Sequence, residues 1–151
     1  MIRIILYIFI CLLTFSVTYA VDQTFNITIT IRKPISITVE RNFNFGIHEQ
    51  KKTDFTVTVA PEDESSAVFK IVGSKNSSVS YTVAEESVKL SNGTDTLKVG
   101  GFIVSGGIKT GAGNIAEGEL KNIGVGATAY IAANQPDTAY YGNATFRAIY
   151  N

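Results

Sequence analysis

The sequence predicts an all-β fold, a sandwich of seven to nine short strands. Apolar residues recur at every second position in several segments, which is the spacing of an extended strand with one buried face. The chain is rich in Thr, Val, Ile, Phe and Tyr and has 13 glycines but no tryptophan, a composition typical of β proteins. Turn-forming clusters separate the segments at nearly regular intervals, which favours a sandwich over a barrel.

The first 20 residues are predicted to be a signal peptide that is not part of the fold. Arg3 supplies a positive start, residues 4–17 form an apolar run that is short for a bilayer span, and Ala20 ends a cleavage pattern. We therefore expect export through the periplasm and a mature chain without a membrane span. Cleavage would remove Cys11, the single cysteine, so disulfides and thiol chemistry are not expected.

The mature chain of about 131 residues (151 minus 20) has the size of one domain. Without Arg3 it carries 12 basic and 13 acidic residues, a formal charge of −1. Nothing in this balance favours nucleic acid or an anionic membrane surface as a partner.

The mature chain opens with two strand patterns in tandem. Residues 25–31 alternate apolar and polar side chains, and the alternation resumes over residues 35–39 after Pro34, which cannot donate a ladder hydrogen bond. Unpaired, the first run would be an aggregation hazard. Two alternatives follow for its partner: a strand of its own sheet, or another molecule.

The other predicted strands follow in chain order, each bounded by turn residues. They are residues 53–60, 67–72, 79–83, 88–90, 96–99, 102–104, 125–133 and 140–150. Asn92-Gly93 is a strong hairpin signal, and Gly100-Gly101 predicts a bulge. Residues 105–121 are predicted to be a long, irregular, glycine-rich loop. Residues 125–133 are small and alternate only weakly, which predicts a strand packed closely against a neighbour.

Several segments resemble a family of small exported bacterial proteins of pilin-like type, similar to the subunits of chaperone–usher fimbriae. The matching segments are Phe45-Gly46, AVFKIVG over 67–73, ANQP over 133–136, YGNATF over 141–146, and Tyr150 next to the end. Many such subunits carry a disulfide, so the similarity is to the cysteine-free branch, whose members are largely uncharacterised. Thr138 stands where many have a glycine.

The resemblance implies an immunoglobulin-like β-sandwich that is incomplete and is completed by a donated strand. It divides the chain into a signal peptide (1–20), an N-terminal donor-strand extension (21–33) and a pilin-like sandwich domain (34–151). The donor residues would be Phe25, Ile27, Ile29 and Ile31. The acceptor groove would be lined by the C-terminal strand residues Ala144, Phe146, Ala148 and Tyr150. Strand addition of this kind combines main-chain hydrogen bonds with pockets for alternate side chains.

The function implied is that of a structural subunit of a surface fimbria, polymerised head to tail after chaperone-assisted export. The expected partners are identical or related pilin subunits, a periplasmic chaperone and an outer-membrane usher. Seven donor residues would span roughly 20 Å, and burial of four apolar side chains contributes about 6–12 kcal/mol. A head-to-tail joint makes open filaments.

The alternative function is a self-contained secreted binding module, such as an adhesin that recognises a host surface or glycans. Tyr140-Tyr141 and the loop over 105–121 would be its contact sites. We expect no enzyme and no cofactor, because no set of residues suited to catalysis stands out in the sequence.

Three local patterns have competing interpretations. Residues 111–116, GAGNIA, match the dinucleotide fingerprint in form, but the residues that follow do not open a helix. His48, the only histidine, lies among polar residues and has no nucleophile motif beside it. Residues 62–64 are acidic but lack the spacing of a calcium loop. In each case a solvated turn or loop is the favoured interpretation. The four N-x-Ser/Thr sequons, at Asn26, Asn76, Asn92 and Asn143, carry little weight.

Overall fold

The structure, a computed structural model, describes residues 20–151, so the predicted signal peptide lies outside the described residues except for Ala20. The chain divides into an N-terminal unit that ends at Thr30 and a domain over residues 31–151. Residues 20–35 contain no strand and no helix. Within the described range, no helix is long and apolar enough to cross a membrane.

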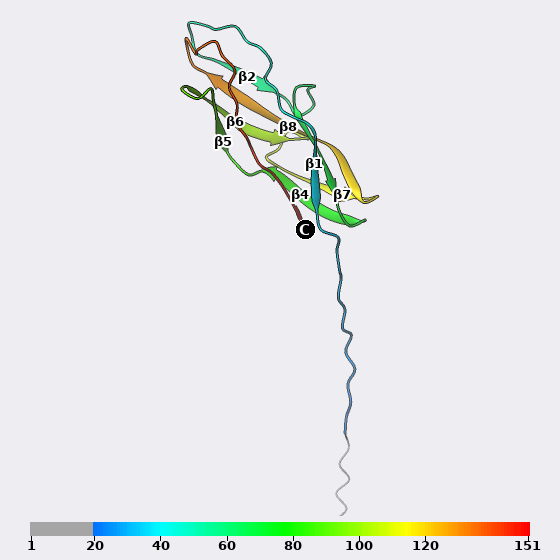
Figure 1. Cartoon of the computed structure of the whole chain (residues 1–151). Helices are drawn as coiled ribbons and strands as arrows, with labels where there is room; N and C mark the ends of the chain where they lie inside the picture. Colours follow the sequence, from blue (N-terminus) through cyan, green and yellow to red (C-terminus); the bar gives the residue numbers. More distant parts are fainter. Residues whose placement is uncertain (1–19) are drawn as a thin grey trace, which may run out of the picture. The chain divides into compact units, whose positions relative to one another are not determined.

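Nine strands make up the described part of the domain, and no helix occurs in it (Figure 1). They are β1 Ser36–Arg41, β2 Phe55–Val59, β3 Ala67–Val72, β4 Ser77–Val83, β5 Ser87–Ser91, β6 Thr96–Val104, β7 Thr110–Ile115, β8 Glu119–Ile131 and β9 Phe146–Tyr150. This confirms the predicted all-β sandwich of seven to nine strands.

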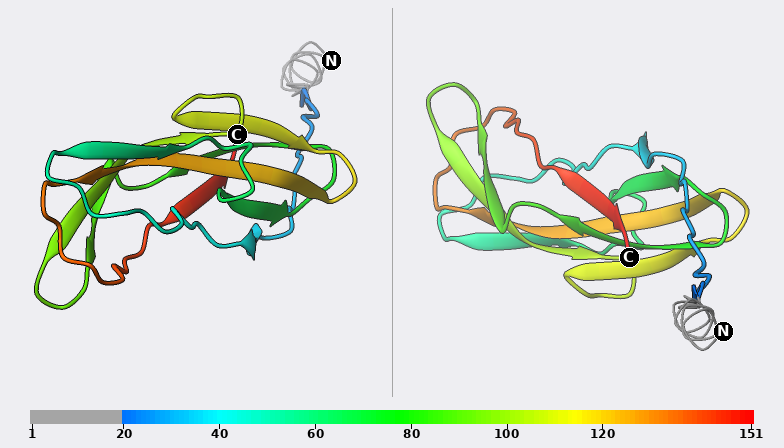
Figure 2. Two further views of the ribbon diagram at one scale, coloured as in Figure 1. Left: turned by 90° about the horizontal axis from the view of Figure 1, so that it is seen from above. Right: turned by 90° about the horizontal axis from the view of Figure 1, so that it is seen from below.

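The strands form two sheets. The larger has the order β1-β3-β8-β6-β5, with β2 paired to β8 as well, and the smaller has the order β7-β4-β9. The 13-residue β8 is long enough to pair with β3 along its first half and with β2 along its second half. All these pairings are antiparallel, and the two views of Figure 2 show the domain with β9 in red.

The main core lies between the two sheets. Its buried members come from β3, β4, β6, β7 and β8, and are Ala67, Ile71, Val79, Tyr81, Val83, Val104, Ile115, Ile123 and Val125. A smaller cluster of Val99, Ala127 and Ala129 extends it along β6 and β8. Each fully buried aliphatic side chain stabilises the fold by about 1.5–3 kcal/mol, so these alternating residues hold the sheets together.

Small residues in β8 allow the chain to cross closely over it. A Cβ atom added at Gly124 would overlap the Pro61 carbonyl group, and one added at Gly126 would lie 2.8 Å from the Pro61 nitrogen. The turn between β2 and β3 passes over β8 at this point, because β2 and β3 pair with successive halves of it. The close neighbour predicted from the small residues is therefore the backbone of the turn at Pro61.

The predicted hairpin and bulge are both present. Asn92 lies between β5 and β6, and its side-chain oxygen accepts the backbone N–H groups of Thr94 and Asp95 at 2.8 and 2.6 Å. In β6 the register shifts between Gly100 and Ile103, and Gly101 has a φ of 65°, a conformation that glycine adopts without strain.

The prediction of an irregular loop over residues 105–121 is wrong. Residues 110–115 form β7, and β8 already begins at Glu119. A Cβ atom added at Gly111 would collide with the ring of Tyr81 on the neighbouring strand. Strand β7 therefore has a glycine where β4 has a bulky side chain. As a result, β7 lacks the alternation of large apolar residues by which a strand is usually predicted. The resemblance of GAGNIA to a nucleotide loop also has no structural basis, since no helix follows it.

The terminal strand is shorter than the predicted 140–150. Only residues 146–150 form β9, while Tyr141 makes an isolated bridge to Ser91 of β5 with hydrogen bonds of 2.8 and 3.0 Å. The end of the chain thus touches the larger sheet first and joins the smaller sheet afterwards.

Candidate functional site: an uncovered apolar strip between two edge strands

Strands β1 and β9 are edges of different sheets. Strand β1 pairs only with β3, and β9 pairs only with β4, among the strands that the structure describes. One edge of each strand therefore keeps its backbone groups without a strand partner. Figure 1 shows both strands on the same face of the domain, with the C-terminus close to the beginning of β1.

The apolar residues of β1 face the core but are not covered. Ile37 lies opposite Ile71 and Val39 lies opposite Phe69 in the register with β3, and directly opposite residues share a face of the sheet. Ile71 is fully buried, whereas Ile37 is 37% and Val39 53% exposed. The core is therefore open along β1.

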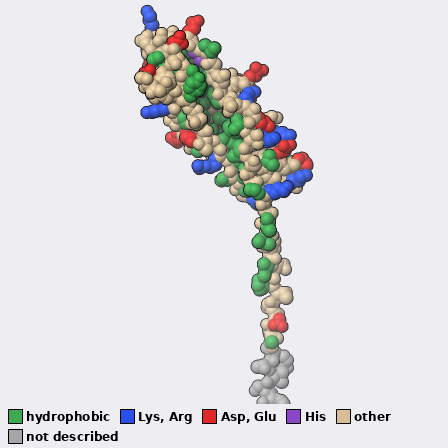
Figure 3. Space-filling model, viewed as in Figure 1, with side chains coloured by type: hydrophobic (Ala, Val, Ile, Leu, Met, Phe, Trp, Pro, Cys, Tyr) green, Lys and Arg blue, Asp and Glu red, His purple; other side chains and the backbone are tan. Residues whose placement is uncertain are grey.

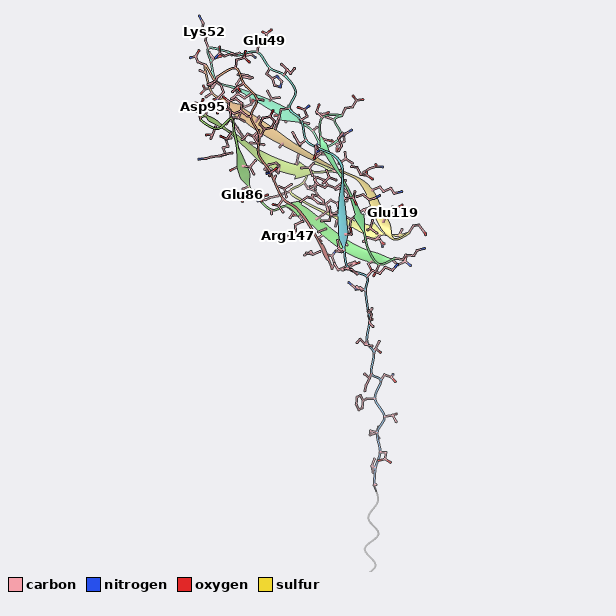
Figure 4. The ribbon with its side chains drawn as sticks, in the orientation of Figure 1. Glu49, Lys52, Glu86, Asp95, Glu119 and Arg147 are labelled. Carbon is pink, nitrogen blue, oxygen red and sulfur yellow. The ribbon has the colours of Figure 1, made fainter. Side chains whose placement is uncertain are left out.

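The apolar residues of β9 are arranged in the same way. Phe146, Ala148 and Tyr150 lie opposite Val83, Tyr81 and Val79, all buried residues of β4. The three β9 side chains contact the core and yet remain only half-buried. Arg147, labelled in Figure 4, and Ile149 alternate with them on the exposed face. Ala144, the fourth predicted groove residue, lies before β9 and is exposed.

Aromatic rings connect the two sides. Phe69 stacks on Phe146 with ring centroids 4.1 Å apart and an interplanar angle of 6°. Farther along, Phe43 and Phe45 lie 4.7 Å apart, and both are half-buried. We call this surface the apolar strip; it comprises Ile35, Ile37, Val39, Phe43, Phe45, Phe69, Phe146, Ala148 and Tyr150. Figure 3 shows hydrophobic side chains gathered along the face that carries β1 and β9.

The strip also offers hydrogen-bonding groups of the backbone. The Thr145 carbonyl accepts the Ala84 N–H at 2.8 Å, and the Asn151 N–H donates to the Ser78 carbonyl at 3.0 Å. Along an antiparallel strand, consecutive residues alternate between the two edges. The N–H and C=O groups of the intervening even-numbered residues, Phe146, Ala148 and Tyr150, therefore point to the open edge of β9.

The same alternation applies to β1. The Gly73 N–H donates to the Gly118 carbonyl at the end of the β3–β8 pairing, so Val72 and Lys70 direct their backbone groups to β1. Their partners there are Ser36 and Thr38. The N–H and C=O of Ile37 consequently point to the open edge. On both strands, then, residues with core-facing side chains carry the unpaired backbone groups.

The Glu85 carboxylate is hydrogen-bonded to the backbone of Thr145, the residue directly before β9. The Thr145 N–H donates to Glu85 Oε2 at 2.8 Å. This backbone hydrogen bond is the main reason why the pKa of Glu85 lies below its usual value, and the charge of Arg147 has a smaller effect in the same direction.

Acidification is expected to release this contact. Because the pKa of Glu85 is lower in the folded chain, its stabilisation is complete above the ordinary glutamate pKa of about 4.3 and is lost as the pH falls through the lowered value. The Thr145 amide resonance should titrate with Glu85 in NMR spectra. Glu85→Gln should abolish that titration, whereas Glu86→Gln, which removes the partner of Lys109, should leave it unchanged. Persistence of the titration in Glu85→Gln would contradict the assignment.

The predicted donor residues lie before the first strand. Phe25, Ile27 and Ile29 belong to the N-terminal unit and are 80%, 83% and 83% exposed. Ile31, at the beginning of the domain, is 88% exposed. No strand includes any of these four residues, so their alternation is present without the strand that it predicts.

The other positions considered from the sequence form no competing site. His48 is exposed, with Nε2 2.7 Å from the Phe45 carbonyl oxygen. Asp63 accepts the Ala60 N–H at 2.7 Å and so stabilises its own turn. Over residues 20–151, no three His, Cys, Asp or Glu side chains gather in a way that could hold a metal ion. An open pocket of about 520 Å³ beside Arg41 has mixed polar and apolar walls, and Arg41 itself is bonded to the Ser66 and Asp63 carbonyls.

The β1 side of the strip was not predicted as part of a site. In the sequence, Ile37, Val39 and Phe69 cannot be told from ordinary core residues, because a sequence does not show whether a core-facing side chain is covered by another segment. One signal was present: after Pro34, apolar residues recur at odd-numbered positions from Ile35 to Phe45, with Arg41 as the one interruption.

The fold and this strip define a small all-β sandwich domain with two open edge strands side by side. The chain belongs to the DUF4402 family, described as a domain of unknown function, which matches residues 50–150. The match covers β2 to β9 and begins after β1. Comparison with curated proteins found no match, and comparison with solved structures found none either.

Proposed function

We propose that this protein is a structural subunit of a surface fimbria, an immunoglobulin-like sandwich whose apolar strip receives a donated strand from a second copy. One observation carries the proposal: core-facing residues of β1 and β9, such as Val39 with 53% exposure, have no cover. The same chain carries an exposed run, residues 25–31, with the alternation that a covering strand needs.

The run and the strip agree in length and chemistry. Seven extended residues span roughly 20 Å, while the five residues of β9 span roughly 13 Å. Phe25, Ile27, Ile29 and Ile31 would meet an aromatic and aliphatic surface, and Asn26, Thr28 and Thr30 would remain on the outer face. Burial of the four apolar side chains contributes about 6–12 kcal/mol before ordering costs, which is comparable to the stability of a whole domain.

The unpaired backbone groups give the joint its hydrogen bonds. Main-chain bonding to an open sheet edge is the mode of strand addition, and β9 offers outward-pointing groups at Phe146, Ala148 and Tyr150. A subunit that receives one strand and donates another joins head to tail, which produces an open filament.

The exposed strip also accounts for the proposed partners. An apolar surface beside unpaired strand edges promotes aggregation, so a subunit in transit needs a temporary cover. A periplasmic chaperone that lends a strand would supply it, and an outer-membrane usher would exchange that strand for the extension of the next subunit. The assembled fibre would stand on the cell surface.

Deletion of residues 24–31 tests the proposal. The exported wild-type protein is expected to form ladders and fibres in size-exclusion chromatography and negative-stain microscopy, and the deletion variant to remain monomeric. A synthetic peptide of residues 21–31 should bind the deletion variant, since its strip is intact. Fibres from the deletion variant would contradict donation by this segment. A wild-type protein that is a single sharp monomer would favour the self-contained binding module.

A further inference from the structure

The end of β9 is tied to the beginning of the domain by a closed ring of three hydrogen bonds. The Lys33 N–H donates to Ser74 Oγ at 2.6 Å, and the Ser74 N–H donates to the Tyr150 hydroxyl at 2.7 Å. The Tyr150 hydroxyl in turn donates to the Lys33 carbonyl at 2.7 Å. One hydroxyl therefore links the chain before β1, the turn after β3 and the terminal strand.

Arg32 adds a second attachment at the same place. Its guanidinium lies over the ring of Tyr150, 5.2 Å from the centroid, and its Nη1 donates to the Asn151 carbonyl at 3.2 Å. We call Arg32 and Lys33 the arm root, because the exposed residues of the extension precede them. Guanidinium–aromatic contacts contribute about 0.5–1 kcal/mol at exposed sites, so the arm root is held by several weak contacts at once.

The neighbouring backbone leaves room for the hydroxyl. A Cβ atom added at Gly73 would collide with the Tyr150 hydroxyl and would lie 2.9 Å from Ile115 Cδ1. Ile115 is fully buried and cannot move aside easily. Glycine at position 73 is therefore needed for Tyr150 to reach Lys33.

The ring and the hydroxyl of Tyr150 act on different parts of the molecule. The ring lies half-buried against the core and belongs to the apolar strip, whereas the hydroxyl reaches only Ser74 and Lys33. The arm root is thus fastened to the same strand that would receive the extension of another copy.

We propose that Tyr150 is a positioning residue, whose hydroxyl fixes the root of a subunit's extension at one end of that subunit's own receiving strip. This inference rests on the proposed function, since the extension and the strip take their roles from it. The fixed root sets where the free part of the extension begins, and so sets the orientation of each subunit relative to the next. Without the hydroxyl, the extension would still be donated, but Arg32 and Lys33 would be less firmly attached to the domain.

Tyr150→Phe in the full chain separates the two parts of the side chain. The ring and the strip remain, and both hydrogen bonds of the hydroxyl are lost. Amide exchange at Ser74 and Lys33 should become about five- to tenfold faster, as expected for the loss of about one net hydrogen bond, while exchange at Val79 in β4 stays unchanged. Fibres should still form, with a shorter persistence length in electron micrographs.

Two further variants control the experiment. Tyr140→Phe removes another hydroxyl with two hydrogen bonds, to Gln135 and Pro136, and should alter neither the arm root nor the fibre. Gly73→Ala keeps the hydroxyl but displaces it, and it also presses on the buried Ile115, so exchange at Ser74 and Lys33 should again become faster, here with a lower melting temperature of the domain. Unchanged exchange at Lys33 in Tyr150→Phe would overturn the role of Tyr150. A wild-type chain that forms no fibres, with exchange still responding, would overturn the proposed function and leave the attachment of the arm root in place.

Discussion

Replacing Ile27 and Ile29 together by aspartate is expected to abolish polymerisation. Each isoleucine contributes about 1.5–3 kcal/mol when buried, so losing both weakens the joint by about 100- to 10,000-fold. The two carboxylates add to this loss, since each would enter an apolar surface without a partner. Size-exclusion chromatography should show a monomer at concentrations where the wild-type protein is expected to form ladders.

The matched control for this variant lies between the two residues. Thr28→Asp adds one carboxylate, where the double variant adds two, at a position whose side chain would point away from the strip, because successive residues of a strand face opposite sides. Its polymerisation should differ from wild type by less than about threefold, the scale of an exposed charge. Equal loss in Thr28→Asp and in the double variant would show that charge near the N-terminus, and not the apolar face, is responsible.

Tryptophan at position 148 is expected to close the strip from the receiving side. Ala148 lies between Phe146 and Tyr150 on the core-facing side of β9 and is the smallest residue of the strip. An indole there would occupy the space that a donated side chain needs. The variant should fail to bind the peptide of residues 21–31, and Ile149→Trp, on the exposed face of the same strand, should bind it normally.

Mixing the variants gives a sharper result than either alone. Ala148→Trp can donate but not receive, and the Ile27/Ile29 double variant can receive but not donate. A mixture should therefore yield heterodimers and no longer species. A thermal melt of each variant checks that the domain is folded, and Ala148→Leu offers a smaller obstruction if the tryptophan variant melts early. Fibres in the mixture would refute the assignment of the strip.

The fold could be predicted where large apolar residues alternate and turn residues separate them. The strands β2, β3 and β4 follow this rule, as does the hairpin at Asn92. Strand β7 escaped prediction because Gly111 lies beneath the ring of Tyr81: its side-chain pattern reflects a neighbour that is distant in the sequence. The length of β9 was overestimated because alternation continues before Phe146, while the chain at Tyr141 pairs with a different sheet.

Only the β9 side of the candidate site could be predicted from the sequence. The alternation of Phe146, Ala148 and Tyr150 is visible in the sequence and places these residues on one face of the last strand. The contribution of β1 to the strip could not be predicted. Ile37 has the same residue type and spacing as a core residue, and it differs only because no other segment packs over its side chain. The hydrogen bond between Tyr150 and Lys33 could not be predicted either, since the two residues are 117 positions apart in the chain.

The ring of hydrogen bonds at Tyr150 has a mechanical consequence for a fibre built in this way. Tension along the filament would arrive through the strand held against β9 and leave through the extension that begins at Lys33. Since Tyr150 connects these two points directly, the pull would pass across one edge of the domain and spare the interface between the sheets. In a chain without cross-linking cysteines in its domain, the contacts at this edge would then take up tension before the core does.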